Sequence, residues 1–356
     1  MRLCYVLSYR APNYIRTQTL LRALRKLPEI DLSLAININT DIKRYQETLS
    51  GVAQLERSAN PPEVYLLGFR GQELYWPLRR LVGRKPIIID AMMSPSLALA
   101  EENQYSFVGK LASFVLRPVE KGILRDATLV LTDTEEHVRA FREKYQLAPD
   151  KLQAIPIGAV EAAPQAVNPG SQERLRVLFY GSFLPLHGFD IILAACANLG
   201  DLPLDLDFIG TNAQIEKLLK RELGQASRLR YRARRWVKFE DILQTELPNT
   251  DLCLGGPFGN TPQARRVITG KTFQALAQAV PVLLGQGAGE TLFQHQHNVL
   301  SVPQGQPEAL KETIHWAWKN RSLLPGIGIQ GRKIYYEYFS IQVIMKKLEK
   351  ILENLG

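Results

Sequence analysis

The sequence predicts an α/β protein of two Rossmann-like domains, each built on a parallel sheet, that face each other across a cleft. Its 356 residues are too many for one ordinary core. In both halves, short apolar runs alternate with amphipathic helical patterns, which is typical of strand–helix–strand units. A stretch rich in Pro, Gly, Ser and Gln separates the halves. The expected domains are residues 1–162 and 174–338, with a linker at 163–173 and a C-terminal amphipathic helix at 339–356 that docks at the seam between the domains.

The first half contains six apolar runs of strand length, each bounded by turn residues. Between them lie helical patterns, of which Thr17–Leu27 and Glu135–Tyr145 are the clearest. The strands are expected at Arg2–Leu7, Leu32–Ile38, Val64–Leu67, Pro86–Ile89, Thr128–Thr132 and Ala154–Pro156.

The second half repeats this alternation. Its strands are expected at Arg176–Tyr180, Leu204–Ile209, Trp236–Phe239, Asp251–Leu254, Val280–Leu284 and Val299–Val302. Helices are expected to begin near Gly188, Asn212, Lys271 and Pro307, and a last amphipathic helix follows at Ser340–Leu355.

Composition limits the class of protein. Apolar residues make up 46% and charged residues 22%, as in soluble globular proteins. The longest uncharged run, Thr272–Gly289, contains a proline and three glycines and is therefore no membrane span. The three cysteines are scattered, which argues against a disulfide framework or a zinc site and indicates a reducing compartment. The N-terminus is interpreted as a first strand rather than a signal peptide, so the expected location is the cytoplasm.

The net charge of +9 is concentrated in two places. Lys220–Lys238 holds eight bases and one acid, a pattern expected mainly of a solvated face. The segment Tyr75–Lys85 interleaves aromatic side chains with cations. For this segment, peripheral contact with the anionic inner face of a membrane is an alternative to a solvated surface. No motif of a nucleic-acid-binding protein is present, so nucleic acid is not an expected partner.

The segment Asp251–Leu284 is the strongest candidate for a binding site. A short buried strand is followed by a glycine-rich loop, the bases Arg265, Arg266 and Lys271, a helix and a second strand. Backbone amides at a helix start attract anions, and the cations can neutralise a diphosphate. From the residues alone, a solvated basic loop remains the alternative.

Five segments, in this order along the chain, resemble the GT-B glycosyltransferases of family 4, also called group 1. These enzymes are retaining and use nucleotide sugars. The resemblance implies transfer of a hexose from a UDP-, GDP- or ADP-sugar to a hydroxyl of a saccharide or lipid-linked acceptor, with no cofactor and no metal. The matching segments are Leu131–Ala159, Val177–Ala195, Leu247–Gly259, Lys271–Leu283 and His297–Ile314.

The resemblance assigns most site residues to the second domain. Arg265, Arg266 and Lys271 would bind the diphosphate and stabilise the charge that develops on it. Gln274 would meet the ribose, and Glu290, at the start of an expected helix, would meet the nucleotide. The remaining donor-binding residues are Gly181, Ser182, His187, Gly188 and Gly259.

Two positions of the second domain depart from the family pattern, and in the first domain Leu97 stands where one branch of the family has a second aspartate. The family usually has a pair of acids where this chain has Arg266 and Gln274. A glutamine amide still donates to and accepts from a ribose diol. The departures nevertheless motivate an alternative, a catalytically impaired GT-B protein that serves as a binding or scaffold subunit. A dinucleotide oxidoreductase is unlikely because no GxGxxG follows a strand.

The first domain is expected to hold the acceptor. Ile87–Ser96 resembles a segment at the cleft edge in one branch of the family, and the resemblance places Asp90 and Ser94 at the acceptor side. Asp90 also follows an expected parallel strand, where ligands gather, although capping of the next helix is an equal explanation. Arg10 and Asn13 are acceptor contacts by position only.

Overall fold

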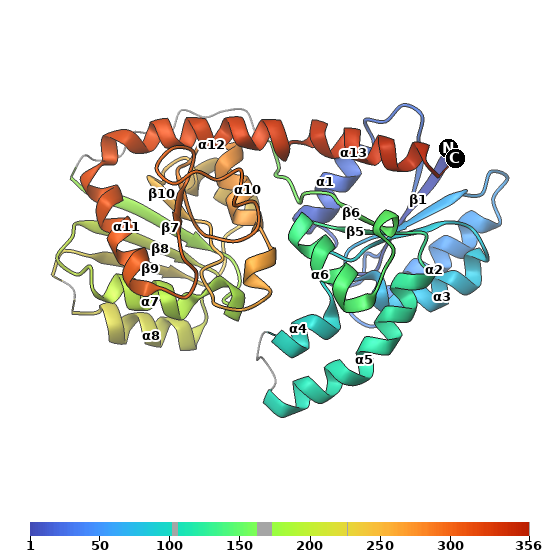
Figure 1. Cartoon of the computed structure of the whole chain (residues 1–356), viewed down its shortest axis with the longest axis horizontal. Coiled ribbons are helices and arrows are strands. Elements are labelled where there is room, and N and C mark those ends of the chain that lie inside the picture. Colours follow the sequence, from blue (N-terminus) through green and yellow to red (C-terminus); the bar gives the residue numbers. More distant parts are fainter. Residues whose placement is uncertain (102–105, 162–172, 226, 356) are drawn as a thin grey trace. The chain divides into compact units, whose positions relative to one another are not determined.

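The structure is a computed structural model that describes residues 1–101, 106–161, 173–225 and 227–355 (Figure 1). The chain forms two compact units. One unit comprises Met1–Val160 together with Ile341–Gly356, and the other comprises Glu161–Ser340. Of the expected linker at 163–173, all but the last residue lies outside the described residues.

The first unit contains a six-stranded parallel sheet in the order β2-β1-β3-β4-β5-β6. The strands are β1 (Arg2–Leu7), β2 (Asp31–Ile36), β3 (Val64–Leu67), β4 (Ile87–Asp90), β5 (Leu129–Thr132) and β6 (Leu152–Ala154). The helices are α1 (Ile15–Leu24), α2 (Lys43–Glu56), α3 (Tyr75–Val82), α4 (Pro95–Glu101), α5 (Ser106–Asp126) and α6 (Glu135–Tyr145).

The last strand of this sheet differs from the expectation of Ala154–Pro156. β6 occupies Leu152–Ala154 instead, with Leu152 and Ala154 buried and Gln153 exposed between them. This alternation is that of a strand with one covered face. Pro156, which has no N–H to donate, follows the strand.

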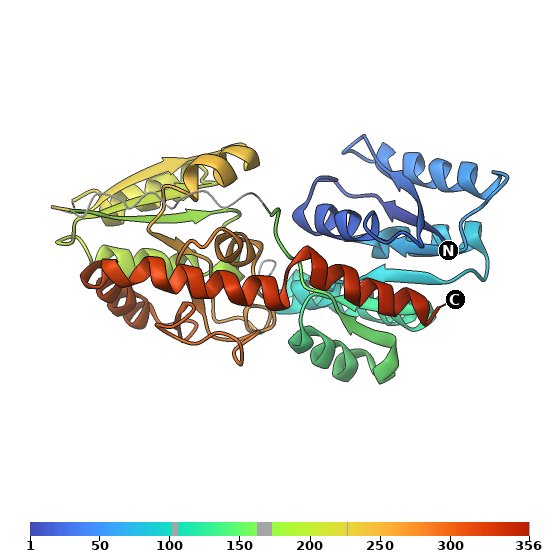
Figure 2. The same ribbon diagram turned by 90° about the horizontal axis from the view of Figure 1, so that it is seen from above.

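Apolar side chains alternate between the two faces of the first sheet. In β1, Cys4 and Val6 enter the core on one face, and Leu3, Tyr5 and Leu7 enter the core on the other. The second of these cores is completed by α13 (Ile341–Glu353), which packs on α1 (Figure 2). The end of the chain is therefore part of the first unit.

The second unit contains a parallel sheet in the order β12-β11-β10-β7-β8-β9. The strands are β7 (Leu175–Tyr180), β8 (Leu204–Ile209), β9 (Arg230–Arg234), β10 (Leu252–Leu254), β11 (Val282–Gly285) and β12 (Leu300–Val302). The helices are α7 (Phe189–Ala197), α8 (Ala213–Leu223), α9 (Phe239–Asp241), α10 (Gly270–Ala277), α11 (Pro307–Lys319) and α12 (Leu324–Tyr338).

The strand expected at Trp236–Phe239 is wrong. The edge strand β9 lies earlier, at Arg230–Arg234, and pairs with β8 at the end of the sheet. An edge strand needs no continuous apolar run, and Arg232 and Arg234 of β9 pair with carboxylates instead. Trp236 lies beyond the strand with 73% of its surface exposed.

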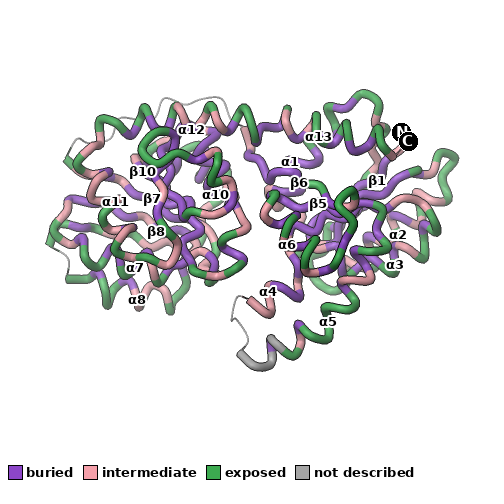
Figure 3. The backbone as a smooth tube through the Cα atoms, in the orientation of Figure 1, coloured by how far each residue is buried: buried purple, intermediate pink, exposed green. Residues whose placement is uncertain are grey.

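Burial follows these layers. Both sheets are buried along most of their strands, whereas the outer helix faces are exposed (Figure 3). Among the helices of the described residues, none combines the length and apolar character that crossing a membrane requires.

Candidate functional site

The candidate site lies at the carboxyl edge of the second sheet. Because the strands are parallel, the loops that follow them gather at this edge, the usual place of ligands in open α/β sheets. The chain leaves β7 through Gly181, whose φ of +122° favours glycine. Its N–H donates to the carbonyl of Ile209 at 3.0 Å, which holds the turn against the end of β8. A Cβ at Gly181 would lie 3.6 Å from Lys271 Nζ, so the turn borders the lysine ammonium.

The start of α10 positions this lysine. Thr269 is the N-cap: its Oγ1 accepts from Thr272 N and donates to the carbonyl of Gly255 at 2.6 Å. Lys271 follows in the first turn and is buried. The partial positive charge of a helix start disfavours a cation there and favours an anion.

Lys271 contacts a second base, His187. Its Nζ lies 3.2 Å from His187 Nδ1 and 5.0 Å from the ring centroid of Phe179. Burial lowers the pKa of Lys271 to about 8. Burial, and then the neighbouring lysine, lowers the pKa of His187 well below its ordinary value, so the neutral imidazole accepts from the ammonium. Among the described residues, no carboxylate forms an ion pair with Lys271.

Two glycines let the neighbouring loops approach closely. Gly188 has a φ of +64°, and a Cβ there would lie 2.4 Å from Gly259 N. A Cβ at Gly259 would lie 2.2 Å from the carbonyl oxygen of Pro185. Gly259 N donates to Leu186 O at 3.0 Å, so the loop after β10 is attached to the loop that carries His187.

The two arginines lie on a short 3-10 turn, Ala264–Arg266. Arg265 is exposed, and its Nη2 donates to Asn260 Oδ1 at 2.7 Å. Arg266 is half-buried, and its Nε donates to the carbonyl of Pro262 at 3.0 Å. Both partners belong to the same loop, which leads from β10 into α10.

The other donor-side residues differ in accessibility. Gln274 is buried on α10, three residues after Lys271 and therefore on the same side of the helix. Ser182 and Glu290 are exposed. The helix expected to begin at Glu290 is wrong, because the chain forms a turn there, with Glu290 N donating to Gly287 O at 3.2 Å. Gly287 and Gly289 both have positive φ values, which do not fit a helix.

In the first unit, Asp90 ends β4 and is fully buried against Arg16. Arg16 Nε donates to one carboxylate oxygen at 3.0 Å and Nη2 to the other at 3.1 Å. Arg16 Nη1 also donates to Pro156 O at 2.9 Å. The sequence analysis missed Arg16. In the sequence, Arg16 stands out only as an arginine beside an apolar helical pattern. Its partner Asp90 is 74 residues away, so the pairing is not visible in the local sequence.

Ser94 is also buried, within a polar cluster. Its Oγ lies 2.9 Å from Glu120 Oε2 and 2.6 Å from the hydroxyl of Tyr145, and it accepts from Leu97 N at 3.1 Å. Arg10 and Asn13 are exposed in the loop between β1 and α1. The four acceptor-side candidates thus divide into two buried residues and two accessible ones.

A second buried pair was also missed by the sequence analysis. Asp133, directly after β5, contacts His137 Nδ1 on α6. The two side chains are four residues apart and both are almost wholly covered. They lie at the carboxyl edge of the first sheet, as Asp90 does.

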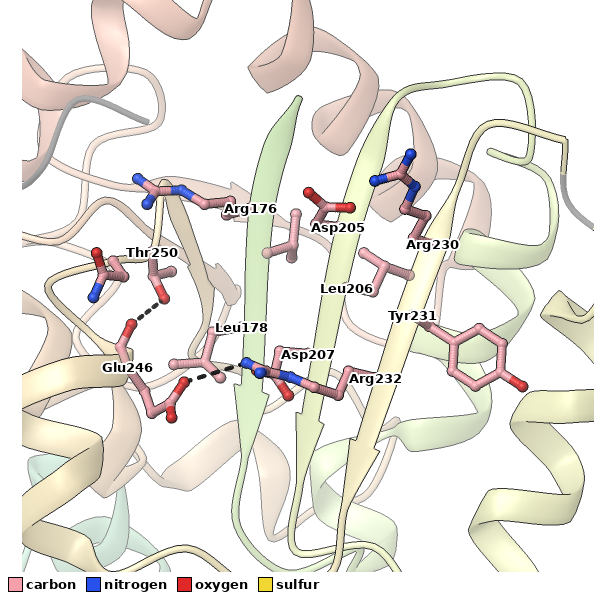
Figure 4. Close-up of a pocket in the computed structure, with 12 residues that line it drawn as sticks. Arg176, Leu178, Asp205, Leu206, Asp207, Arg230, Tyr231, Arg232, Glu246 and Thr250 are labelled. Carbon is pink, nitrogen blue, oxygen red and sulfur yellow. Dashed lines mark hydrogen bonds and ion pairs between the residues drawn. The ribbon is translucent and has the colours of Figure 1, made fainter. Parts of the chain in front are cut away.

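Four of the eight bases in the segment Lys220–Lys238 form ion pairs, namely Arg221, Arg232, Arg234 and Arg235. Arg234 bonds to Asp207 and to Glu246 at 2.5 Å each, and Arg232 pairs with the same two acids. A hollow of about 360 Å³ lies over this face of β7, β8 and β9 (Figure 4). Its lining includes three arginines and three acids together with apolar and neutral polar side chains, but neither Lys271 nor Gly181, so it is separate from the candidate site.

Among the described residues, no group of three His, Cys, Asp or Glu side chains could hold a metal ion. The three cysteines are buried free thiols.

Comparison of the sequence with models of protein families and with curated proteins gives no match. Solved structures do match. Sucrose-phosphate synthase from Thermosynechococcus elongatus has 15% identity and a TM-score of 0.72, over 100% of this chain and 99% of that one. Anabaena HepE in complex with UDP and glucose has 13% identity and a TM-score of 0.71, over 99% and 100%. A glycosyltransferase from Rickettsia africae has 12% identity and a TM-score of 0.66, over 99% and 98%.

These similarities extend over the whole chain and define the class of fold. The protein has the GT-B fold of glycosyltransferases, with two Rossmann-like domains built on parallel sheets. The fold expected from the sequence is thereby confirmed.

Proposed function

We propose that the protein is a retaining glycosyltransferase that transfers a hexose from a nucleoside-diphosphate sugar to an acceptor hydroxyl. The observation that carries this proposal is the contact of Lys271 with His187 beneath the Gly181 turn. A buried lysine meets a half-buried histidine at a helix start, and no carboxylate forms an ion pair with the lysine within the described part of the chain. Such a site has the positive charge and the helix start that favour binding of a diphosphate.

The nucleotide is proposed from the similar structures. Anabaena HepE was solved with UDP and with UDP-glucose. UDP-sugars are therefore the first donors to test here, followed by GDP- and ADP-sugars. We propose that Gln274, on the same side of α10 as Lys271, meets the ribose through its amide.

The proposed reaction uses the charge of the site. The bond between the anomeric carbon and the leaving phosphate oxygen breaks as the acceptor oxygen attacks on the same face. The acceptor proton passes to the departing phosphate oxygen. Lys271 and the first amides of α10 stabilise the negative charge that grows on the diphosphate. Arg265 and Arg266 add charge from the preceding loop when the donor is bound, and Ser182 and Glu290 complete the exposed rim.

For the acceptor side, we propose direct contacts from the exposed Arg10 and Asn13. Asp90 has both carboxylate oxygens bonded to Arg16, and Ser94 is bonded within its own cluster. These two buried residues are proposed to position the carboxyl ends of the strands rather than to touch the acceptor. The proposed acceptor is a saccharide or a lipid-linked saccharide, used in the cytoplasm at or near the membrane surface.

The second candidate function is a GT-B binding or scaffold protein with impaired catalysis. It is favoured by Gln274 and Arg266, which replace two acids of the family pattern. Both functions allow nucleotide binding, but only the enzyme turns the donor over.

A thermal-shift screen with UDP, GDP, ADP and their sugars tests the proposal. We expect one nucleotide to raise the melting temperature, because a ligand that binds only the folded state stabilises it. Lys271→Ala should abolish that shift and the slow hydrolysis of the donor. The matched control is Lys217→Ala on α8, an exposed lysine outside the site. Binding without any turnover would favour the scaffold, and equal turnover in Lys271→Ala would refute the assigned role.

A further inference from the structure

Helix α5 has one covered face and one exposed apolar face. Ile123 and Leu124 enter the core of the first unit, and Glu120 is buried in the cluster around Ser94. The opposite face carries Leu111, Phe114, Val115 and Val119, all exposed. Their spacing of three, four and eight residues from Leu111 places them in one stripe along the helix. Phe114 is 77% exposed and Val115 is 64% exposed, which is unusual for side chains of this size.

Helix α3 extends this surface. Trp76 and Leu81 are exposed on it, and a Cβ at Gly122 of α5 would lie 3.8 Å from the Trp76 ring. Asp126, at the end of α5, fixes the two helices together. It accepts from the Tyr75 hydroxyl at 2.6 Å and from Arg79 Nε at 2.8 Å. The apolar residues of both helices therefore form one surface of the first unit, which we call the α3–α5 face.

Cations flank the α3–α5 face. Arg117, Lys121 and Arg125 follow one another at four-residue intervals along α5, beside the apolar stripe. Arg117 Nη2 donates to the carbonyl of Lys144 at 3.3 Å, and Lys121 Nζ donates to Gln146 Oε1 at 2.9 Å. Both partners are neutral, so these two hydrogen bonds leave the cationic charges uncompensated. Arg80 and Arg84 add exposed positive charge from α3 and the residues after it.

Within α5, acidic residues do not offset this charge. Between residues 106 and 126 the only acids are Glu120 and Asp126. The first is buried beneath the helix, and the second is held by Arg79 and Tyr75. The α3–α5 face therefore combines an apolar stripe with a cationic border.

We propose that the α3–α5 face docks on an anionic lipid surface, with Phe114 and its apolar neighbours entering the headgroup region. An amphipathic helix with a cationic border binds such a surface through apolar burial and charge attraction together. This inference rests on the membrane contact in the proposed function. It places most of that contact on α5 rather than on the segment Tyr75–Lys85. In the segment Tyr75–Lys85, Tyr75, Leu78 and Val82 are buried and Arg79 is ion-paired, so α5 supplies most of the accessible apolar area.

Vesicle co-sedimentation tests this inference. The full chain should bind vesicles of equal parts phosphatidylglycerol and phosphatidylcholine, and pure phosphatidylcholine much less. The double variant Phe114→Asp/Val115→Asp should reduce partitioning roughly tenfold or more, because it removes apolar burial and adds repulsion. Its control is Ile329→Asp, which alters an exposed apolar residue on α12.

A second pair of variants tests the charge. Arg117→Glu/Lys121→Glu should lose binding to anionic vesicles roughly tenfold or more. The control variant Lys217→Glu/Lys220→Glu, on α8, should show a much smaller loss of binding to anionic vesicles. Equal binding to neutral vesicles, or unchanged binding by the α5 variants, would overturn the proposal. A dimer in size-exclusion chromatography that these variants dissociate would also overturn it, by assigning the face to a second copy of the chain.

The nucleotide-induced thermal shift should be unchanged in all α5 variants. This shift reports on folding and on the donor site, and it is measured independently of vesicle binding. If the α5 variants keep the thermal shift but lose vesicle binding, the result supports the docking of the α3–α5 face without depending on the donor site. Vesicle binding without any nucleotide shift would leave the α3–α5 face supported and would refute only the donor site.

Discussion

The Lys271 ammonium is a buried cation whose polar neighbour is another base, and this arrangement costs free energy until an anion arrives. Its pKa falls from an ordinary 10.5 to about 8. Below pH 8 the buried Lys271 side chain is protonated in the folded protein, and burial of this positive charge lowers stability. As the pH rises from 8 to 10.5, the unfolded chain binds more protons than the folded one, so this group makes stability increase.

Replacing this cation should therefore stabilise the protein when no ligand is bound. We expect Lys271→Met to raise the free energy of unfolding at pH 7 by up to about 3 kcal/mol, since each tenfold change in an acid constant is worth about 1.4 kcal/mol. The gain should shrink between pH 8 and pH 10.5. Urea unfolding at several pH values measures it. Equal or lower stability at pH 7 would contradict a buried, uncompensated cation.

Donor binding should show the opposite dependence on pH. A bound diphosphate favours the protonated lysine and raises its pKa, so binding takes up a proton above pH 8. Nucleotide affinity should be level below pH 8 and fall by up to about tenfold per pH unit above it. Calorimetry in buffers of different ionisation enthalpy would detect the proton. In Lys271→Gln, the residual nucleotide affinity should not decrease in this way above pH 8.

The backbone conformation of Gly181 disfavours any side chain. Gly181→Ala should destabilise the protein by about 1–2 kcal/mol because of its φ of +122°, and it should weaken nucleotide binding because the added methyl group would stand against Lys271 in the site. Gly326→Ala on α12 is the control. A Cβ there meets nothing within 4 Å, so a change of up to about 1 kcal/mol in the stabilising direction is expected. Thermal unfolding with and without nucleotide compares the two variants, and equal behaviour would argue against a tight turn.

At the scale of elements, α13 acts as a core element of the first unit. Ile344 and Leu348 are fully buried in the same core as Leu20 and Leu24 of α1. Leu348→Ala should lower the free energy of unfolding by about 2–5 kcal/mol, as expected for a large-to-small change in a core. Lys346→Ala on the exposed side should have little effect. Hydrogen exchange should report the loss in β1 and β3, and unaltered protection there would show that the helix is dispensable.

Elements with a regular apolar pattern could be predicted from the sequence. β7 and β8 were placed correctly because their side chains are buried on at least one face. β9 was not, because an edge strand of alternating arginines lacks that pattern, and the more apolar Trp236–Phe239 attracted the prediction. The exposed stripe of α5 was missed for the related reason that an apolar residue in a helical pattern is normally assigned to a core.

At the scale of the whole molecule, the sequence predicted the fold but only part of the site. Lys271 was predicted as a site residue because the resemblance covered its segment, and the helix start gave an independent physical reason. Its contact with His187 joins residues 84 positions apart, and the pairing of Arg16 with Asp90 spans 74. Such contacts depend on how strands are ordered in a sheet, which local patterns do not specify.

The return of α13 to the first unit has a consequence for synthesis. Ribosomes make chains from the N-terminus, and domains generally fold in that order. Here the first unit lacks part of its core until Ile341–Gly356 has been made. The part of α1 that packs on α13 therefore stays uncovered while the entire second unit is translated, and the first unit to emerge is the last to be completed.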